Sequence, residues 1–242
     1  MAGPARSAIA IVGLGLALIG GAVPAMAGSD DGNFMVRALG TVVDPDSEAT
    51  VSAGGVVPGA DADVSTEVIP ALTLTYFFNK NFAVELFCCF AQHEIDGKGT
   101  IASFGEIADT WIFPPALTLQ YHFANMGSFK PYVGAGVQHI NFFDTGTGAN
   151  VIGATKVDID AAWGFTLQAG VDVSLGNGWS LNADVKKTWL DTTVTWRNAA
   201  AAGGVNVVGD ADVDPWIFSA GLGYRFNLGS VFGHRAEAAP IK

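Results

Sequence analysis

The sequence predicts an all-β protein, an eight-stranded antiparallel up-and-down transmembrane β-barrel. Eight segments alternate apolar residues with small or polar ones, the period-two pattern of a strand whose two faces differ. Three short and four long connections separate these segments, as in membrane barrels with tight turns at one end. Only 14% of the 242 residues are charged, whereas soluble domains carry about a quarter.

Residues 1–27 have the features of a signal peptide. Arg6 gives a short basic start, residues 7–23 form an apolar run, and Pro24-Ala25-Met26-Ala27 ends in the small-x-small pattern of a signal peptidase site. We expect cleavage after Ala27, the alternative being an uncleaved membrane anchor. No later stretch reaches the roughly 20 apolar residues of a membrane-spanning helix, which leaves an exported soluble protein or a membrane barrel.

The first three strands are predicted over residues 33–43, 68–78 and 82–92, with a tight turn at 79–81 between the last two. In each strand we expect one face to meet lipid and the other to meet the lumen. In the first strand the lipid face carries Phe34, Val36 and Ala38, and the lumen face carries Met35, Arg37 and Leu39. In the second strand the lipid face carries Leu72, Leu74, Tyr76 and Phe78, and the lumen face carries Ala71, Thr73 and Thr75. In the third strand the lipid face carries Val84, Leu86, Cys88 and Phe90, and the lumen face carries Glu85, Phe87 and Cys89.

The fourth and fifth strands, over residues 115–123 and 130–137, form a predicted hairpin around an Ala-Asn-Met-Gly-Ser-Phe turn. The apolar faces suit lipid, and the opposite faces carry Gln120, His122 and several small residues that suit a narrow lumen.

The last three strands are predicted over residues 161–175, 179–196 and 216–226, with a tight turn at 175–178 between the first two. The alternation is clearest in the last strand, where four aromatic residues share a face with Ala220 and Leu222. The three outward faces begin at Trp163, Leu181 and Trp216, and the opposite faces carry Thr166, Gln168 and Asp172; Asn182, Asp184 and Lys186; and Ser219, Gly221, Gly223 and Arg225.

The long connections, residues 44–67, 93–110, 144–160 and 197–215, are predicted to be loops at one end of the barrel. Aromatic residues support this layout, because Tyr and Trp favour the two membrane–water interfaces. We expect a tyrosine belt at the short-turn end and a tryptophan belt at the long-loop end, formed by Tyr76, Tyr121, Tyr132 and Tyr224 and by Trp111, Trp163, Trp189, Trp196 and Trp216.

Several segments are specific enough to compare with known families. They read Gly-Asn-Phe-Met-Val-Arg, Leu-Thr-Leu-Thr-Tyr-Phe-Phe, Asn-Phe-Ala-Val-Glu-Leu, Pro-Pro-Ala-Leu-Thr-Leu-Gln-Tyr-His-Phe, Lys-Pro-Tyr-Val-Gly-Ala-Gly-Val, Gln-Ala-Gly-Val-Asp, Leu-Asn-Ala-Asp-Val-Lys-Lys and Asp-Pro-Trp-Ile-Phe with Gly-Leu-Gly-Tyr-Arg-Phe. From Gly32 to Phe226, in this order, they resemble the OmpW family of outer-membrane proteins.

The resemblance implies an eight-stranded outer-membrane barrel over residues 28–226 with a narrow, largely hydrophobic channel for small hydrophobic molecules. It also implies contact with outer-membrane lipid and with the barrel assembly machinery. Two features depart from the family. Residues 227–242, which we expect to form a periplasmic tail, follow the final aromatic, and Asp184 and Lys186 lie where the resemblance implies an apolar closure.

The strand alternation places six charged residues on the lumen face, and Gln120 and His122 join them. A lone buried charge is costly, so such groups pair with one another or reach water. We expect a polar plug across the barrel floor. It is either a structural network that fills a narrow barrel or a switch or binding site. The charged residues are Arg37, Glu85, Asp172, Asp184, Lys186 and Arg225.

Above this plug, the alternation predicts an apolar upper lumen lined by Leu39, Phe87, Cys89, Ile140 and Leu190. An apolar solute that enters from outside would meet a polar floor and leave sideways, between strands, into the bilayer. The Gly- and Ala-rich stretches 51–62 and 199–209 are expected to form the rim of this funnel as loops.

The formal net charge of −11 argues against nucleic acid as a partner, because phosphate backbones are bound by clustered Lys and Arg. Most of the 23 acidic residues lie in or beside the long connections. Two interpretations stay open: divalent cations bridge these carboxylates to lipopolysaccharide phosphates, or the carboxylates form a solvated, repelling surface.

An enzyme is the rival class, but the sequence has no Gly-x-Ser-x-Gly, no His-Glu-x-x-His and no paired-Cys metal spacing. His93 beside Glu94 is the one notable pair, and we interpret it as solvated near the outer rim. Cys88 and Cys89 are adjacent, so they point to opposite faces as inert thiols. We therefore expect no enzyme, metal or cofactor. The alternative function is a structural or surface-receptor barrel for phage or bacteriocins.

Overall fold

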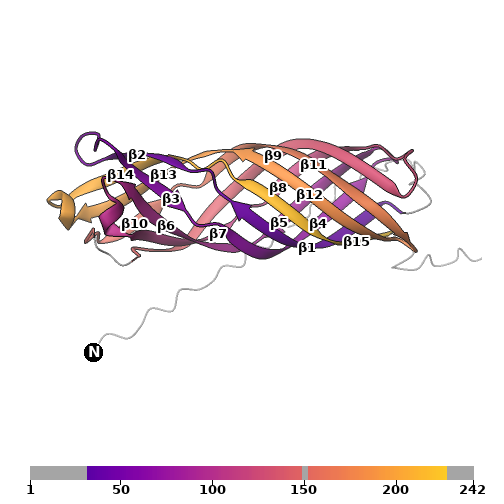
Figure 1. Ribbon diagram of the computed structural model, residues 1–242, viewed down its shortest axis with the longest axis horizontal. Helices are drawn as coiled ribbons and strands as arrows, with labels where there is room; N and C mark the ends of the chain where they lie inside the picture. The colour runs from indigo at the N-terminus through magenta and orange to yellow at the C-terminus, as the bar shows by residue number, and fades with distance from the viewer. Residues whose placement is uncertain (1–31, 149–151, 228–242) are drawn as a thin grey trace, which may run out of the picture.

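The computed structural model describes residues 32–148 and 152–227 (Figure 1). The predicted signal peptide and all of the predicted tail except Asn227 lie outside the described residues, so both stay predictions. Within the described ranges, no helix is long and apolar enough to cross a membrane. The helical pieces seen there are two short 3-10 turns, η1 (Ala102–Phe104) and η2 (Ala200–Ala202).

Eight antiparallel strands close into a barrel, which confirms the predicted fold class. Their order around the barrel is their order in the chain, and β9 pairs with β11 to complete the circle. The barrel strands are β1 (Phe34–Asp44), β4 (Glu67–Phe77), β5 (Phe82–Cys89), β8 (Ala116–His122), β9 (Phe129–Gly146), β11 (Ala162–Gly176), β12 (Trp179–Trp189) and β15 (Trp216–Phe226).

The prediction that the long connections are loops is wrong. Seven further strands continue the barrel at one end, on the left in Figure 1, and we call them the extension. They form two groups, β3-β6-β7 paired to the outer half of β9, and β10-β13-β14-β2. The strands are β2 (Glu48–Ser52), β3 (Ala60–Val64), β6 (Ala91–Gly99), β7 (Glu106–Phe113), β10 (Lys156–Ile159), β13 (Asp191–Ala199) and β14 (Val205–Asp212).

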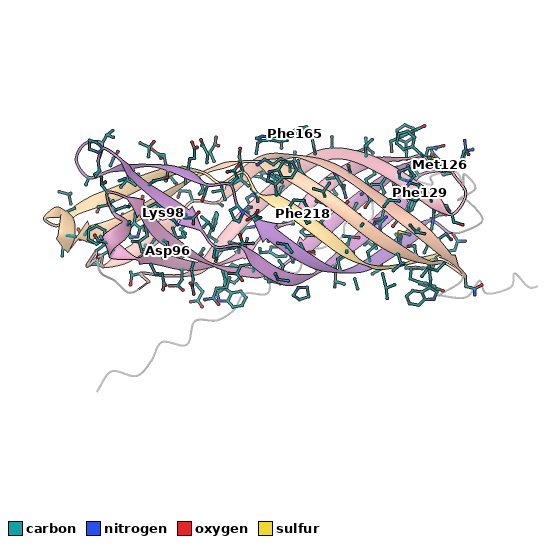
Figure 2. All side chains as sticks on the ribbon, viewed as in Figure 1. Asp96, Lys98, Met126, Phe129, Phe165 and Phe218 are labelled. Carbon is teal, nitrogen blue, oxygen red and sulfur yellow. The ribbon has the colours of Figure 1, made fainter. Side chains whose placement is uncertain are left out.

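The extension escaped prediction because its outer face is charged where the barrel's is apolar. In β6, Ala91, His93 and Ile95 are buried while the intervening Gln92 and Glu94 are exposed. This alternation has period two like that of a barrel strand, but it belongs to a sheet that faces water. Figure 2 shows the contrast, with Asp96 and Lys98 on the extension and Phe165 and Phe218 standing outward from the barrel.

The barrel has its apolar residues outside and its polar residues inside. Leu119 and Phe165 are 56% and 51% exposed, whereas Arg37 and Thr41 are 0% exposed. The wall is tight at its glycines: a Cβ on Gly136 would lie 2.0 Å from the Leu117 carbonyl oxygen. Lipid therefore replaces water as the solvent of the outer face, and the lumen is filled by side chains, as expected for eight strands.

Two aromatic residues do not belong to the predicted belts. Tyr132 is 2% exposed and lies inside the barrel, and Trp196 is 3% exposed and lies inside the extension. The Trp196 ring nitrogen Nε1 donates a hydrogen bond to the Ile107 carbonyl oxygen at 2.9 Å. Other predicted belt residues do face outward, including Trp163 and Tyr224, which are 68% and 42% exposed.

Candidate functional site

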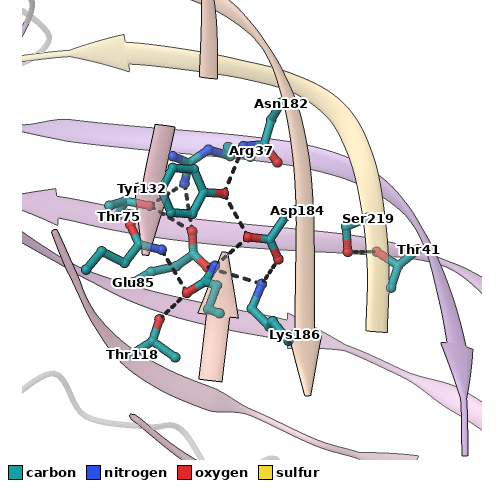
Figure 3. Close-up of polar contacts among 12 residues, drawn as sticks. Arg37, Thr41, Thr75, Glu85, Thr118, Tyr132, Asn182, Asp184, Lys186 and Ser219 are labelled. Carbon is teal, nitrogen blue, oxygen red and sulfur yellow. Dashed lines mark hydrogen bonds and ion pairs between the residues drawn. The ribbon is translucent and has the colours of Figure 1, made fainter. Parts of the chain in front are cut away.

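Arg37 is the centre of a buried polar cluster in the barrel lumen (Figure 3). Its guanidinium donates from Nε and Nη2 to the two carboxylate oxygens of Asp172, at 3.1 and 2.7 Å. Its Nη1 donates to Glu85 and to the Thr75 hydroxyl, both at 2.7 Å. The planar fork thus joins strands β1, β4, β5 and β11 across the lumen, a geometry that a guanidinium supplies and an ammonium does not.

Lys186 is the second cation of the cluster and lies next to the apolar part of the lumen. Its Nζ is 2.5 Å from Asp184 Oδ1 and 3.4 Å from Glu85 Oε1, and the side chains of all three are 1% exposed. The same ammonium lies 4.8 Å from the centre of the Phe87 ring. Polar floor and apolar upper lumen therefore meet at this cation–π contact.

Tyr132 completes the cluster, although the sequence prediction assigned it to the outer belt. Its hydroxyl donates to Asp184 Oδ2 at 2.8 Å and accepts from Asn182 Nδ2 at 3.0 Å. The ring lies across Gly170, where a Cβ would come within 2.5 Å of the Tyr132 hydroxyl. The alternation of side chains along the strand could have predicted this position, because Tyr132 is on the same strand face as Gly134 and Gln138, which both face the lumen.

Gln168, which the sequence prediction placed inside but did not assign to the plug, connects the carboxylates. Its Nε2 donates to Asp184 at 2.7 Å and to Glu85 at 2.9 Å. Its Oε1 accepts from Gln120 and Thr118 at 3.0 and 2.8 Å. Its donor therefore serves the Asp184 oxygen that Lys186 does not contact and shares the Glu85 oxygen with Lys186.

The two remaining predicted plug residues lie closer to the short-turn end. His122 Nε2 is 2.9 Å from Gln120 Oε1, and its ring stacks on Tyr132 at 4.7 Å between centroids. Arg225 lies over the Phe77 ring at 3.7 Å, and its Nε donates to the Gly32 carbonyl. The structure thus brings Arg37, Glu85, Asp172, Asp184 and Lys186 together. Arg225 lines a small cavity nearer the short-turn end, which Asp172 and His122 also line.

The five predicted apolar lumen residues are all buried, in two neighbouring clusters. Leu39, Phe87 and Cys89 belong to one, and Ile140 and Leu190 to the other. Phe87, Cys89 and Ile140 line a cavity that continues from the barrel into the extension. Leu39 and Leu190 are buried in the same clusters but do not line this cavity.

Most of the cavity lining comes from the extension, which the sequence prediction missed. The volume of the cavity is about 70 Å³, so the passage is narrow. Further apolar lining residues include Val51, Ile95, Ile112, Phe142, Ile159, Val194, Trp196 and Val213. The predicted rim segments 51–62 and 199–209 are partly strand and turn, not loops, and they pack into the extension's core through Val51, Ala60, Ala199 and Val207.

The interpretation of His93 as solvated is wrong. Its side chain faces inward from β6, is 3% exposed and lines the apolar cavity. Its ring nitrogen Nδ1 is 2.7 Å from the Ser65 carbonyl oxygen. Glu94, its neighbour in the chain, points outward and is exposed.

The outer surface of the extension carries carboxylates and a few cations. Lys156 and Arg197 both hydrogen-bond to Asp158, and these bonds hold the pKa of its carboxyl below the usual range. Among the described residues, no three His, Cys, Asp or Glu side chains are grouped so as to hold a metal ion. Both interpretations of the acidic surface stay predictions.

A family model, described as the OmpW family, matches residues 30–226. The chain belongs to the OmpW family. An uncharacterized outer-membrane protein of Sinorhizobium fredii, y4mB, is 37% identical over 200 residues, 83% of this chain and 82% of that protein. The crystal structure of the outer membrane protein OprG from Pseudomonas aeruginosa superposes with a TM-score of 0.76 at 32% identity, covering 81% of this chain and 96% of OprG.

A more distant relative is the dibenzothiophene metabolism operon protein PahQ of Pseudomonas aeruginosa. It is 27% identical over 171 residues, 70% of this chain and 77% of PahQ. Membership of the OmpW family places the barrel in the outer membrane, where its apolar outer face contacts lipid. The resemblance read from the sequence is therefore confirmed, together with the location.

Proposed function

We propose that this OmpW-family barrel carries small hydrophobic molecules from the cell exterior into its apolar cavity and releases them sideways into the bilayer. One observation supports the proposal above the others. The apolar cavity ends on a floor of buried ion pairs, so a solute that enters it has no apolar route to the periplasm.

The energetics favour entry and oppose passage through the floor. An apolar solute gains roughly 25 cal/mol for each Å² of apolar surface removed from water. To pass Lys186 and Glu85 it would have to separate buried charges, which costs several kcal/mol for each ion. We therefore propose that the polar cluster acts as a seal, and that the solute leaves above it.

The wall between β4 and β6 is the proposed exit. The β4–β5 ladder ends at the pair Ala71 and Cys89, and the β3–β6 ladder begins at the pair Val64 and Ile95. In the described chain, no ladder pairing joins residues 67–70 to β6, and Pro70 has no backbone N–H to contribute. Cys89, a cavity residue, lies at the lower edge of this gap.

The name of PahQ points to the same class of solute. It places that relative in an operon of dibenzothiophene metabolism, and dibenzothiophene is an apolar aromatic compound. We propose no catalytic role for this barrel. Lipopolysaccharide at the extension and the barrel assembly machinery remain proposed partners.

A lysine in the middle of the cavity tests the proposal. Ile140 lines the cavity and is 4% exposed, so Ile140→Lys places a charge without a partner in the solute's path. We expect cellular uptake of an apolar aromatic probe to fall to the level of cells without the barrel, while uptake of a hydrophilic probe stays unchanged. Asn141→Lys, one residue along and on the other face of β9, is the matched control and should transport normally.

If cells without the barrel take up the apolar probe as fast as cells with it, the transport proposal fails. The surface-receptor alternative then becomes the better account. Comparable folded amounts of each variant in the outer membrane, checked by the gel mobility of unheated barrel, are required for this comparison.

The orientation gives a separate prediction. We expect the extension to face the exterior and the short turns to face the periplasm. A membrane-impermeant maleimide added to intact cells should label Ala201→Cys, in η2, and should not label Lys80→Cys, in the turn between β4 and β5. Labelling of Lys80→Cys from outside would reverse the assigned orientation.

A further inference from the structure

His93 lines the apolar cavity and has a ring nitrogen without a hydrogen-bond partner among the described residues. Four of the cavity's five polar lining side chains bond to other protein groups through their polar atoms. They are Ser47 with the Val64 amide, Thr110 with Thr145, Gln138 with Pro114 and Thr188, and Thr192 with the Asp160 carbonyl. The fifth is His93, which bonds through one ring nitrogen.

The partner of that nitrogen fixes the chemistry of the other. The Ser65 carbonyl oxygen, 2.7 Å from Nδ1, is able only to accept a hydrogen bond, so Nδ1 carries the hydrogen. A ring that is 3% exposed in an apolar cavity stays neutral, because the imidazolium would lose its hydration. Nε2 therefore keeps a lone pair, and it has no hydrogen-bond partner among the described residues.

We propose that His93 Nε2 accepts a hydrogen bond from a solute that is apolar except for one hydroxyl group. The cavity then takes up alcohols and phenols at a smaller desolvation cost than the same cavity without an acceptor would. This inference rests on the proposed transport function and adds a specificity-determining residue to it.

The position of His93 suits this role. It pairs with Thr110 across β6 and β7, and Ile95 and Ile112 line the cavity beside it. The apolar body of a solute would pack on these isoleucines while its hydroxyl reaches Nε2. Without an acceptor in the cavity, a hydroxyl loses its hydrogen bond to water on entry, which costs free energy. A hydrocarbon has no such hydrogen bond to lose.

The test is competitive uptake of 2-naphthol and naphthalene, given together to cells that make the barrel. The ratio of the two initial rates, after subtraction of the rates in cells without the barrel, does not depend on how much barrel is present. We expect His93→Phe to lower the 2-naphthol to naphthalene ratio by about threefold to tenfold, the loss of one hydrogen bond. His93→Gln, which keeps an acceptor, should restore part of the ratio.

His139→Phe is the matched control. His139 also has its Nδ1 bonded to a backbone carbonyl, that of Ala162 at 2.9 Å, but it stacks on Trp163 on the outer face. Its replacement should leave the ratio unchanged.

The outcomes separate this inference from the function beneath it. A ratio that stays constant while His93→Phe lowers both rates equally would show that His93 only shapes the cavity, and the inference would be wrong. An equal fall of the ratio in His139→Phe would also overturn it. If neither probe enters faster with the barrel than without it, the transport proposal itself is overturned.

Discussion

Replacement of Arg37 by methionine is expected to lower the free energy of unfolding of the barrel by about 3–5 kcal/mol. The guanidinium is buried and supplies hydrogen bonds to Asp172, Glu85 and Thr75. Methionine fills a similar volume but leaves two carboxylates without their main cation. The measurement is urea-induced unfolding of the barrel in phospholipid vesicles, followed by tryptophan fluorescence.

Arg197→Met is the matched control for the loss of an arginine ion pair. Arg197 Nε is 2.5 Å from Asp158, but its side chain is 51% exposed on the extension, where solvent screens an ion pair and leaves it little net effect on stability. Equal losses in the two variants would contradict the account of the polar cluster. An Arg37→Met barrel as stable as the parent would also contradict this account. It would mean that two buried carboxylates can lose the guanidinium without lowering the free energy of unfolding.

The polar cluster could be predicted from the sequence because strand parity does not depend on loop structure. Once the lipid-facing residues of each strand were recognised, Arg37, Glu85 and Lys186 had to face the lumen. Their pairing followed from the cost of a lone charge in a medium of low polarity. Which cation meets which carboxylate depends on the stagger between strands, which one sequence does not specify.

Tyr132 and Trp196 show where the reasoning from composition fails. Both were assigned to belts by residue type, whereas parity for Tyr132 already pointed inward. Tyr132 reaches Asp184 only because Gly170 leaves room for its ring, a contact between two strands that no local pattern contains. Trp196 is buried because it packs in the hydrophobic core of the extension, a region that the sequence predicts to be loops.

The extension and His93 were missed for one physical reason. Strands that leave the bilayer exchange an apolar outer face for a charged one, so the membrane template no longer fits them. The sequence predicts a loop over residues 93–110, and His93 is therefore interpreted as solvated at the outer rim. A search for polar-out alternation within residues 91–99 would have placed Ala91, His93 and Ile95 on a common inner face.

Asp184→Ala is expected to open the floor of the barrel to ions. The Asp184 carboxylate accepts from Lys186 at 2.5 Å, from Tyr132 at 2.8 Å and from Gln168 at 2.7 Å. Its removal leaves these three donors short of an acceptor in a buried site, at a cost of about 1–3 kcal/mol for each neutral donor and more for the ammonium. Water that enters to satisfy them would make the floor conductive.

Conductance of single barrels in a planar lipid bilayer measures this effect, with the parent barrel expected near its closed level and Asp184→Ala well above it. Asp184→Asn keeps the volume and one acceptor oxygen, so its conductance should rise much less. Asp210→Ala, on the exposed face of the extension, should leave conductance unchanged. A conductance of Asp184→Ala equal to that of the parent would mean that the ion pairs do not form the seal. The barrier to ions would then lie in the apolar cavity above, where the narrow space lined by Phe87 and Ile140 excludes them by dehydration.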